Sequence, residues 1–198
     1  MNTYFERRKQ EPYYKYVRTL LGVLAFNANS VCDVGSNGTD MISWLPCKKK
    51  VSIDLRKPLI AEGVRSIKAD FLKYDFKRKF DIVTCFQVLE HIDDENVQAF
   101  ANKLTTITKH LLIVSVPYKW SKGACKGHLQ DPVDESKFIS WFNTSPDCEQ
   151  MIKPVFSRVI HSDNRFRLGR LVVVFVSDDI SDKLTEMNET DNWLIRYN

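Results

Sequence analysis

Residues 31–41 read VCDVGSNGTDM, an apolar run that ends in Asp33 and is followed by Gly35. Branched and small apolar residues before a glycine are typical of a short buried strand, so we predict a strand over residues 30–35. In α/β proteins a loop after such a strand can hold a nucleotide-like ligand, because its backbone approaches the ligand closely. The stretch therefore predicts an α/β fold with a ligand at this loop.

Strand-like and helix-like segments alternate on both sides of this loop. The expected strands cover residues 49–55, 65–71, 80–88 and 111–118, and the expected helices cover 12–26, 39–45 and 93–110. This alternation predicts a parallel sheet with helices on both faces and right-handed crossovers. Ligands bind such sheets at the carboxyl ends of the strands, where we expect four segments to converge: Asp33 to Gly38, Asp54, Asp70 and FQVLEHI at 86–92.

The rest of the chain does not continue this alternation of strands and helices. Residues 118–150 are rich in Gly, Pro, Trp and charge, with a short helix expected at 134–142. Two further strands, 155–162 and 170–178, are expected to pair antiparallel. We predict a single domain over 1–198, made of a helical segment (1–29), a core (30–118), an insertion (118–150), a final strand pair (151–178) and a polar tail (179–198).

Composition restricts the function classes. The chain has 198 residues, is 43% hydrophobic and carries a net charge of +4, which is too small to argue for a nucleic-acid or membrane partner. The N-terminal residues lack the apolar core of a signal peptide, and no apolar run approaches membrane-spanning length. Five scattered cysteines without a C-x-x-C pair are typical of reduced thiols. We expect a cytoplasmic protein, monomeric or homodimeric.

The loop does not fit a dinucleotide or a nucleoside triphosphate. The G-x-G-x-x-G fingerprint, counted from Gly35, meets Asn37 and Asp40 at its second and third glycine positions. A phosphate-binding loop would need G-K-[ST], which is absent. An NAD-dependent oxidoreductase is thus disfavoured.

S-adenosylmethionine fits better because it needs no pyrophosphate cradle. Asp54 lies 19 positions after Gly35, where a βαβ unit places a carboxylate for ribose hydroxyls, and Asp70 follows the next expected strand near the adenine. Asn37 replaces the usual glycine, yet asparagine tolerates left-handed backbone better than most residues, so the turn stays feasible.

Five segments together resemble the class I S-adenosylmethionine-dependent methyltransferases, small bacterial members in particular: VCDVGSNGTD, VSIDL, KADF, FDIVTCFQVLEHI and LLIVSVPY. The resemblance covers about residues 30–118. It implies a Rossmann-like sheet of seven strands, mostly parallel, with an antiparallel last strand and helices on both faces. It also implies S-adenosylmethionine as the cofactor.

The resemblance assigns cofactor contacts position by position. Asp33, Gly35, Ser36 and Gly38 would line the methionine portion, and Asp54 would bind ribose with Leu55 on the adenine. Asp70 and Phe71 would flank the base, Phe86 and Gln87 would lie near the sulfonium, and Arg18 or a tyrosine of residues 12–16 would reach the carboxylate. The alternatives are strand-end caps for Asp33 and Asp54, a core position for Phe86, and helix capping for Glu90 and His91.

The acceptor site is expected in the insertion, which combines aromatic and titratable side chains: Tyr118, Trp120, His128, Asp131, Asp134 and Trp141. GHLQDPVDESKF at 127–138 resembles small bacterial methyltransferases acting on sugars or polysaccharide precursors. We predict His128 as general base with Asp131 orienting it, and His161 as the competing base. The alternative is that His128 fills a turn and that Asp131 and Asp134 cap the following helix.

These patterns favour O-methylation of a small molecule, such as a sugar, a polysaccharide precursor or a natural product. No [ND]-P-P-[YF] stretch follows the strand at 80–88, which disfavours methylation of base or glutamine amino groups. Asp93 and Asp94 are better explained as a helix start than as metal ligands, so no metal is expected. The alternative is a regulatory or catalytically degenerate cofactor-binding protein, which the missing glycine at Asn37 keeps open.

Overall fold

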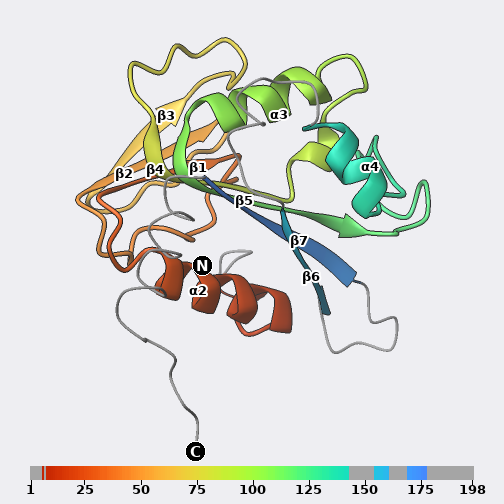
Figure 1. The fold of residues 1–198 in the computed structure, drawn as a ribbon, viewed down its shortest axis with the longest axis horizontal. Helices are drawn as coiled ribbons and strands as arrows, with labels where there is room; N and C mark the ends of the chain where they lie inside the picture. The colour runs from red at the N-terminus through yellow and green to blue at the C-terminus, as the bar shows by residue number, and fades with distance from the viewer. Residues whose placement is uncertain (1–5, 7, 143–153, 161–168, 178–198) are drawn as a thin grey trace, which may run out of the picture.

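Seven strands form one sheet in the computed structural model, which describes residues 6, 8–142, 154–160 and 169–177 (Figure 1). The strands are β1 (Ser30–Val34), β2 (Lys49–Asp54), β3 (Val64–Lys68), β4 (Phe80–Phe86), β5 (Thr108–Tyr118), β6 (Val155–Ile160) and β7 (Gly169–Val176). Their order is β3-β2-β1-β4-β5-β7-β6. The first five strands run parallel to one another, and β7 runs antiparallel to both β5 and β6. The seven-stranded fold predicted from the sequence is therefore confirmed.

The register of the strands decides which residues meet at the carboxyl edge. Asp33 of β1 lies beside Ser52 of β2 and Thr84 of β4. The antiparallel β7 begins at this same edge, since its Arg170 pairs with Pro117 of β5. A residue from the start of β7 therefore joins the ends of the parallel strands.

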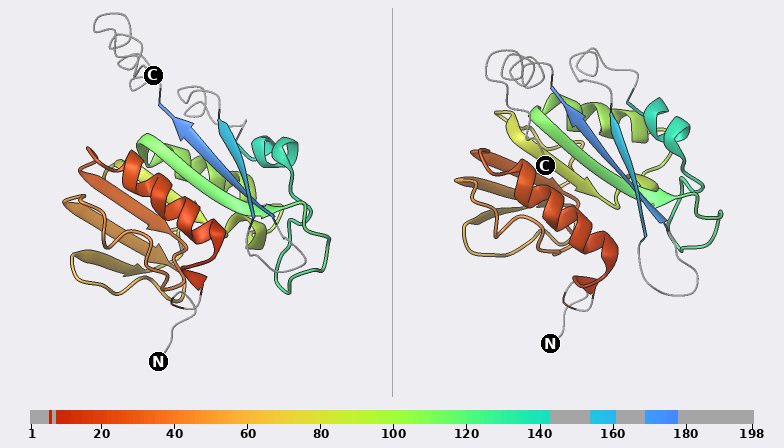
Figure 2. Two further views of the ribbon diagram at one scale, coloured as in Figure 1. Left: turned by 90° about the horizontal axis from the view of Figure 1, so that it is seen from below. Right: turned by 60° about the horizontal axis from the view of Figure 1, so that its bottom comes forward.

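Helices cover both faces of the sheet. Helix α2 (Pro12–Leu24) begins at a proline, as expected, and packs on one face, whereas α3 (Val97–Thr106) and α4 (Glu135–Ser140) lie on the other (Figure 2). A single 3-10 turn, η1 (Leu89–His91), follows β4. Proline at the first helical position suits a helix start because its fixed φ is helical and it gives up no needed N–H.

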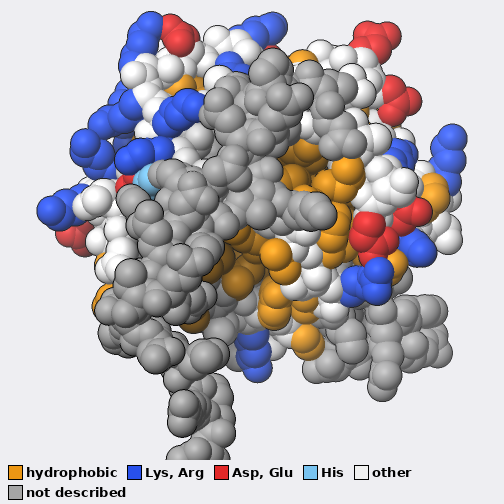
Figure 3. Space-filling view, in the orientation of Figure 1, with side chains coloured by type: hydrophobic (Ala, Val, Ile, Leu, Met, Phe, Trp, Pro, Cys, Tyr) orange, Lys and Arg blue, Asp and Glu red, His pale blue; other side chains and the backbone are white. Residues whose placement is uncertain are grey.

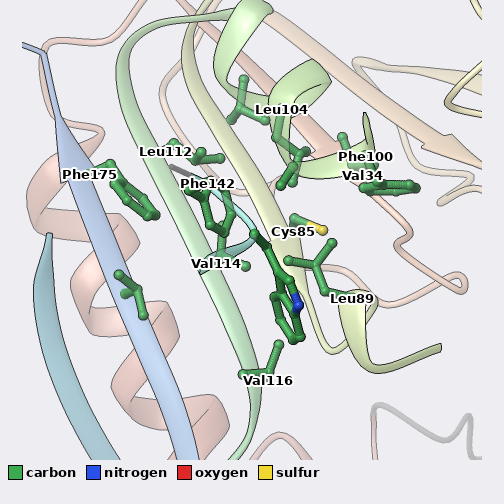
Figure 4. Close-up of a cluster of buried hydrophobic side chains, with 14 of the residues drawn as sticks. Val34, Cys85, Leu89, Phe100, Leu104, Leu112, Val114, Val116, Phe142 and Phe175 are labelled. Carbon is green, nitrogen blue, oxygen red and sulfur yellow. The ribbon is translucent and has the colours of Figure 1, made fainter. Parts of the chain in front are cut away.

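The sheet separates two hydrophobic clusters. The α3 and α4 side is built around Leu104, Leu112 and Phe138, and the α2 side around Leu21 and Ile113, all with no solvent exposure. Figure 4 shows the first cluster, where aromatic and aliphatic side chains from β5, β7 and α3 interdigitate. Burial of this kind is the main favourable term in folding, because apolar surface is removed from water.

Three expected elements differ in the structure. Residues 39–45 form turns instead of a helix, because the Asp40 carboxylate accepts a hydrogen bond from the Ser43 backbone N–H (3.0 Å). Helix α3 begins at Val97, four residues later than expected, because Asp93 closes a turn with the Asn96 N–H (2.9 Å). Strand β5 begins at Thr108, inside the segment expected to be helical.

The face seen in Figure 3 has a basic region and a hydrophobic region. Lys and Arg side chains gather at its upper left, over β2 and β3, and hydrophobic side chains gather near its centre, over β5 and β7. The four described cysteines (Cys32, Cys47, Cys85 and Cys125) are free thiols, as expected. Among the described helices none has the length and apolar character needed to cross a membrane.

Candidate functional site

The loop after β1 is closed by three residues with left-handed backbone. Gly35, Asn37 and Gly38 have φ values of 78°, 46° and 70°. A Cβ at Gly35 would collide with the Val88 side chain, so this position needs glycine for space as well as for conformation. Asn37 adopts the left-handed conformation that the sequence analysis considered feasible, and the loop closes without a glycine there.

Asp33 places a buried carboxylate at the end of β1. Its Oδ1 accepts a hydrogen bond from the Thr84 hydroxyl (2.7 Å), and within the described chain its Oδ2 has no partner. Burial raises the pKa of Asp33 to about 7, an effect that the Thr84 hydrogen bond opposes and the negative charges of Asp54 and Asp40 reinforce. A buried carboxylate with one free oxygen is well suited to a cationic group of a ligand.

Asp54 joins the ends of β1 and β2. Its carboxylate accepts hydrogen bonds from three backbone N–H groups: Asn37 (2.9 Å), Arg56 (2.8 Å) and Lys57 (2.7 Å). The capping role that the sequence analysis left open for Asp54 is therefore present. Its binding of ribose stays a prediction.

The other residues that are predicted to contact the nucleoside differ in their exposure to solvent. Asp70 accepts a hydrogen bond from the Leu72 N–H (2.9 Å), and the Leu55 side chain is 61% exposed. The Phe71 ring packs in the core against Phe100, with ring centroids 4.5 Å apart. Only the backbone of Phe71 is thus left for the predicted contact with the base.

A cavity of about 630 Å³ opens at the carboxyl edge of the sheet, a volume typical of small-molecule sites. It is lined by the loop after β1, the end of β4, η1, the first turn of α2, the insertion and the start of β7: Arg8, Glu11, Tyr13, Tyr14, Asp33, Gly35, Ser36, Asn37, Thr39, Met41, Phe86, Gln87, Glu90, His91, Trp120, Ala124, Cys125, His128 and Arg170. Gly38, Asp54 and Asp70 lie outside this lining.

Of the two alternatives for the N-terminal helix, the structure favours the tyrosines. Tyr13 and Tyr14 line the cavity, whereas Arg18 stacks on Trp44 (4.5 Å) and donates to the Asp40 carbonyl (3.2 Å) away from it. The expected contact between Arg18 and the cofactor is therefore not supported. The Tyr13 hydroxyl lies 2.6 Å from the Ser115 hydroxyl, which fixes α2 to β5.

Gln87 has the strained backbone that often marks a functional position. Its φ is 58°, which is uncommon for a residue other than glycine. Its backbone N–H and its side-chain amide both donate to Ser115, at 2.8 and 3.0 Å. These bonds hold Gln87 and the adjacent Phe86 at the cavity wall, as their predicted position near the sulfonium requires.

The insertion brings His128 and Asp131 together. The His128 Nδ1 lies 2.7 Å from the Asp131 Oδ2, and the two side chains are 6% and 1% exposed. The Trp120 ring stacks on the imidazole, with centroids 5.6 Å apart. The capping alternative holds for Asp134, which accepts from the Lys137 N–H (2.9 Å), and not for Asp131. His161 lies outside the described residues.

The Glu90 side chain is buried close to His91 and His128. Burial raises its pKa to about 8, and the negative charge of Asp131 adds to this, while its own backbone N–H and the charge of Arg170 oppose it. Its Oε2 has no hydrogen-bond partner within the described residues. A buried, unsatisfied carboxylate costs free energy unless a ligand satisfies it.

Residues 32–111 match the model of a protein family described as a methyltransferase domain. This match spans the loop after β1, Asp54, Asp70 and the β4–η1 segment in the order that the sequence analysis used. Residues 32–111 are thus similar in sequence to a methyltransferase domain. No curated protein matches the chain by sequence.

Solved structures of methyltransferases share the fold of this chain. The N-methyltransferase NodS from Bradyrhizobium japonicum, in complex with S-adenosyl-l-homocysteine, matches with a TM-score of 0.63 and 13% identity over 87% of this chain and 91% of NodS. The 1,6-didemethyltoxoflavin-N1-methyltransferase of Burkholderia thailandensis gives 0.65 and 15%, over 85% and 80%. The N-terminal domain of EvdMO1, in the presence of S-adenosylhomocysteine and D-fucose, gives 0.56 and 16%, over 85% and 83%.

The sequence analysis missed the cavity residue Arg170 and assigned only a capping role to two others. Arg170 lies on β7, more than forty positions beyond His128 in the sequence, and only the antiparallel register brings it to the cavity. Glu90 and His91 belong to the segment 86–92 that was expected at the ligand-binding edge, but capping was the only role considered for them.

Proposed function

We propose that this methyltransferase transfers a methyl group from S-adenosylmethionine to a hydroxyl of a small molecule, such as a sugar, a polysaccharide precursor or a natural product. One observation carries the proposal: a single cavity is lined both by the loop after β1 and by His128 with Trp120. Donor and acceptor can therefore meet in one enclosed space. The cavity volume fits a small acceptor better than a macromolecule.

The methionine end of the cofactor would bind at the loop after β1. Its ammonium group would meet the free Oδ2 of Asp33, the buried oxygen without a described partner. The ring of Tyr14, which lines the same cavity, would face the positive end of the cofactor, an arrangement worth about 0.5–2 kcal/mol. Asp54, at the end of β2, would accept from the ribose hydroxyls.

The reaction is an in-line displacement at the methyl carbon. The acceptor oxygen forms a bond to the carbon while the carbon–sulfur bond breaks, its electron pair stays on sulfur, and S-adenosylhomocysteine leaves. The hydroxyl proton would pass to Nε2 of His128, since Nδ1 donates to Asp131 and this bond selects the required tautomer. Holding the two reactants aligned can contribute roughly 7–11 kcal/mol in favourable cases.

Structural neighbours do not decide the acceptor atom. NodS and the toxoflavin enzyme are named as N-methyltransferases, and the EvdMO1 domain was crystallised in the presence of D-fucose. The proposal of a hydroxyl acceptor rests instead on the His128–Asp131 pair, because a hydroxyl, unlike a neutral amine, gains most from a base during the transfer.

Methyl transfer from labelled S-adenosylmethionine to a panel of sugars, nucleotide sugars, phenols and amines tests the proposal. We expect turnover on a hydroxyl acceptor, and a loss of roughly 10²- to 10⁴-fold in His128→Ala with unchanged affinity for S-adenosylhomocysteine. His110→Ala, on β5 outside the cavity lining, is the matched control. Cofactor binding without turnover on any acceptor would favour the regulatory alternative, and turnover restricted to amines would overturn the hydroxyl assignment.

A further inference from the structure

Three side chains with metal-binding atoms converge in the cavity. Glu90 and His91 belong to η1 and His128 to the insertion, and one ligand atom of each lies within 4.8 Å of the others. The two imidazole rings meet edge to face, with centroids 4.9 Å apart. Two imidazoles and one carboxylate are a common ligand set for divalent transition metals in proteins.

Both histidines are already oriented through Nδ1. The Nδ1 of His91 lies 2.8 Å from the Gly127 carbonyl oxygen, and the Nδ1 of His128 lies 2.7 Å from the Asp131 carboxylate. Each of these oxygens can only accept, so Nδ1 carries the proton on both rings and Nε2 is left as the free lone pair. Metal-binding histidines typically show this pattern, in which a carbonyl or carboxylate holds the other ring nitrogen.

The backbone holds the two halves of this cluster together across 37 positions of sequence. The Glu90 carbonyl accepts hydrogen bonds from the Leu129 N–H (2.7 Å) and the Gln130 N–H (3.2 Å). The Gln130 side chain in turn donates to the Ile92 carbonyl (2.9 Å). The insertion is thereby fixed to η1 beside the cluster, which pre-organises the three side chains.

The Glu90 carboxylate supplies a second, independent observation. Its residue is 1% exposed, it lines the cavity, and its Oε2 has no hydrogen-bond partner within the described residues. Arg170 contributes a positive charge to its surroundings, yet the guanidinium is stacked on Trp120 at 4.2 Å. A cation bound between Glu90 and the two Nε2 atoms would satisfy this oxygen.

We propose that Glu90, His91 and His128 bind a divalent first-row transition-metal ion through one carboxylate oxygen and two Nε2 atoms, with further positions open to the cavity. Bond lengths of about 2.0–2.2 Å would place the ligand atoms roughly 3.4 Å apart, so the side chains must close by about 1 Å around the ion. The sequence analysis, which considered cysteine and acidic ligands, expected no metal.

The role of the ion rests on the proposed function, whereas its binding does not. An acceptor hydroxyl could occupy an open position, where the ion would lower its pKa and the proton would leave to solvent water. With the ion bound, His128 would hold the ion that activates the acceptor and would not take the proton itself. Asp131 is then a positioning residue that keeps Nε2 of His128 unprotonated.

Titration of metal-free, untagged protein with Co²⁺, followed by its visible absorption and by calorimetry, tests the site. We expect one ion per chain, binding at least tenfold weaker in Glu90→Gln and His128→Ala, and about 10- to 100-fold weaker in Asp131→Asn. The affinity order should be Zn²⁺ above Co²⁺ above Mn²⁺, with Mg²⁺ weakest, because imidazole ligands follow the Irving–Williams series.

Two control variants separate this site from other metal-binding groups. His110→Ala removes a histidine outside the cavity, and Cys125→Ser removes the thiol that lines it. Both should bind Co²⁺ like the unmodified chain, and loss of binding in Cys125→Ser alone would place the ion on the thiol. Wild-type binding no tighter than that of a Glu90→Gln, His128→Ala double variant would overturn the proposal.

Affinity for S-adenosylhomocysteine, measured on the same samples, distinguishes the two proposals. Retained cofactor binding without a metal site would overturn only the metal inference. A metal site in a chain that binds no cofactor would overturn only the proposed function.

Discussion

At the scale of single residues, Asp54 has a structural role, and we propose that the same carboxylate binds ribose. Its hydrogen bond from the Asn37 N–H ties the loop after β1 to β2. Asp54→Ala should therefore weaken S-adenosylhomocysteine binding by roughly 10- to 100-fold, because hydrogen bonds to a charged group contribute about 1.5–3 kcal/mol each.

Calorimetric titration of the Asp54→Ala variant with S-adenosylhomocysteine measures this loss. Asp54→Asn is the matched control, since an amide oxygen in place of Oδ1 can still accept from the Arg56 and Lys57 N–H groups while the charge is lost. We expect an intermediate affinity for this variant. Near-native affinity in Asp54→Ala would contradict the ribose assignment.

Asp33 makes the stability of the ligand-free protein depend on pH. Its pKa is about 7 in the folded chain, raised first by burial, and near 3.8 when unfolded. Between these values the folded state holds a proton that the unfolded state has lost, so stability falls as pH rises from about 4 to about 7. Asp33→Asn removes this titration while keeping an acceptor for the Thr84 hydroxyl.

Urea unfolding of ligand-free protein at pH 5 and pH 8 measures the effect. The stability of Asp33→Asn relative to wild type should increase by about 2–3 kcal/mol between the two pH values. Because both proteins contain Glu90 and the other titratable groups, the pH dependence that these groups cause cancels when the two stabilities are subtracted. A difference that does not change with pH would show that Asp33 titrates near its ordinary value.

At the scale of elements, α4 depends on its N-cap because it has only six residues. Asp134 has extended backbone and accepts from the Lys137 N–H (2.9 Å), which satisfies one free donor of the first turn. Asp134→Ala should lower the free energy of unfolding by about 1 kcal/mol. Thermal or urea unfolding measures this, with Asp134→Asn as a conservative control.

The Asp134 variant should leave S-adenosylhomocysteine affinity unchanged, since the side chain lies outside the cavity lining. A large loss of cofactor affinity with native stability would instead show that α4 positions the insertion around His128.

The elements differ in how much of them the sequence could predict. Strands β1 and β4 were identified from nearly continuous apolar runs, and β2 from a segment that closes on Asp54. Residues 39–45 were not, because three buried side chains, Met41, Ile42 and Leu45, imitate helical spacing while the Asp40 carboxylate closes a turn. Local hydrogen bonds from short polar side chains can thus override an apolar pattern.

The cavity shows the same division between local and long-range information. The loop after β1 and the pairing of His128 with Asp131 are local in sequence, and the sequence analysis predicted both. The meeting of His91 with His128 and the arrival of Arg170 depend on the insertion folding back onto η1 and on the antiparallel register of β7. No spacing rule contains that information, because long-range backbone hydrogen bonds set it.

At the scale of the whole molecule, the sheet divides the core into two layers, and we expect substitutions in one layer to affect stability independently of the other. Leu21 of α2 and Leu104 of α3 have no solvent exposure and belong to different clusters. Truncating either to alanine should cost about 2–5 kcal/mol, because a buried side chain is replaced by a cavity. Since the two side chains belong to different clusters, the effects of the two substitutions should add to within about 0.5 kcal/mol.

A pair within one layer supplies the contrast. The rings of Phe142 and Phe175 contact each other, with centroids 4.8 Å apart, and aromatic pairs contribute about 0.5–1.5 kcal/mol beyond their buried area. Urea unfolding of both sets of single and double variants at low temperature should therefore show coupling for Phe142→Leu with Phe175→Leu, and none for Leu21→Ala with Leu104→Ala. Strong coupling across the sheet would mean that the two layers respond as one unit.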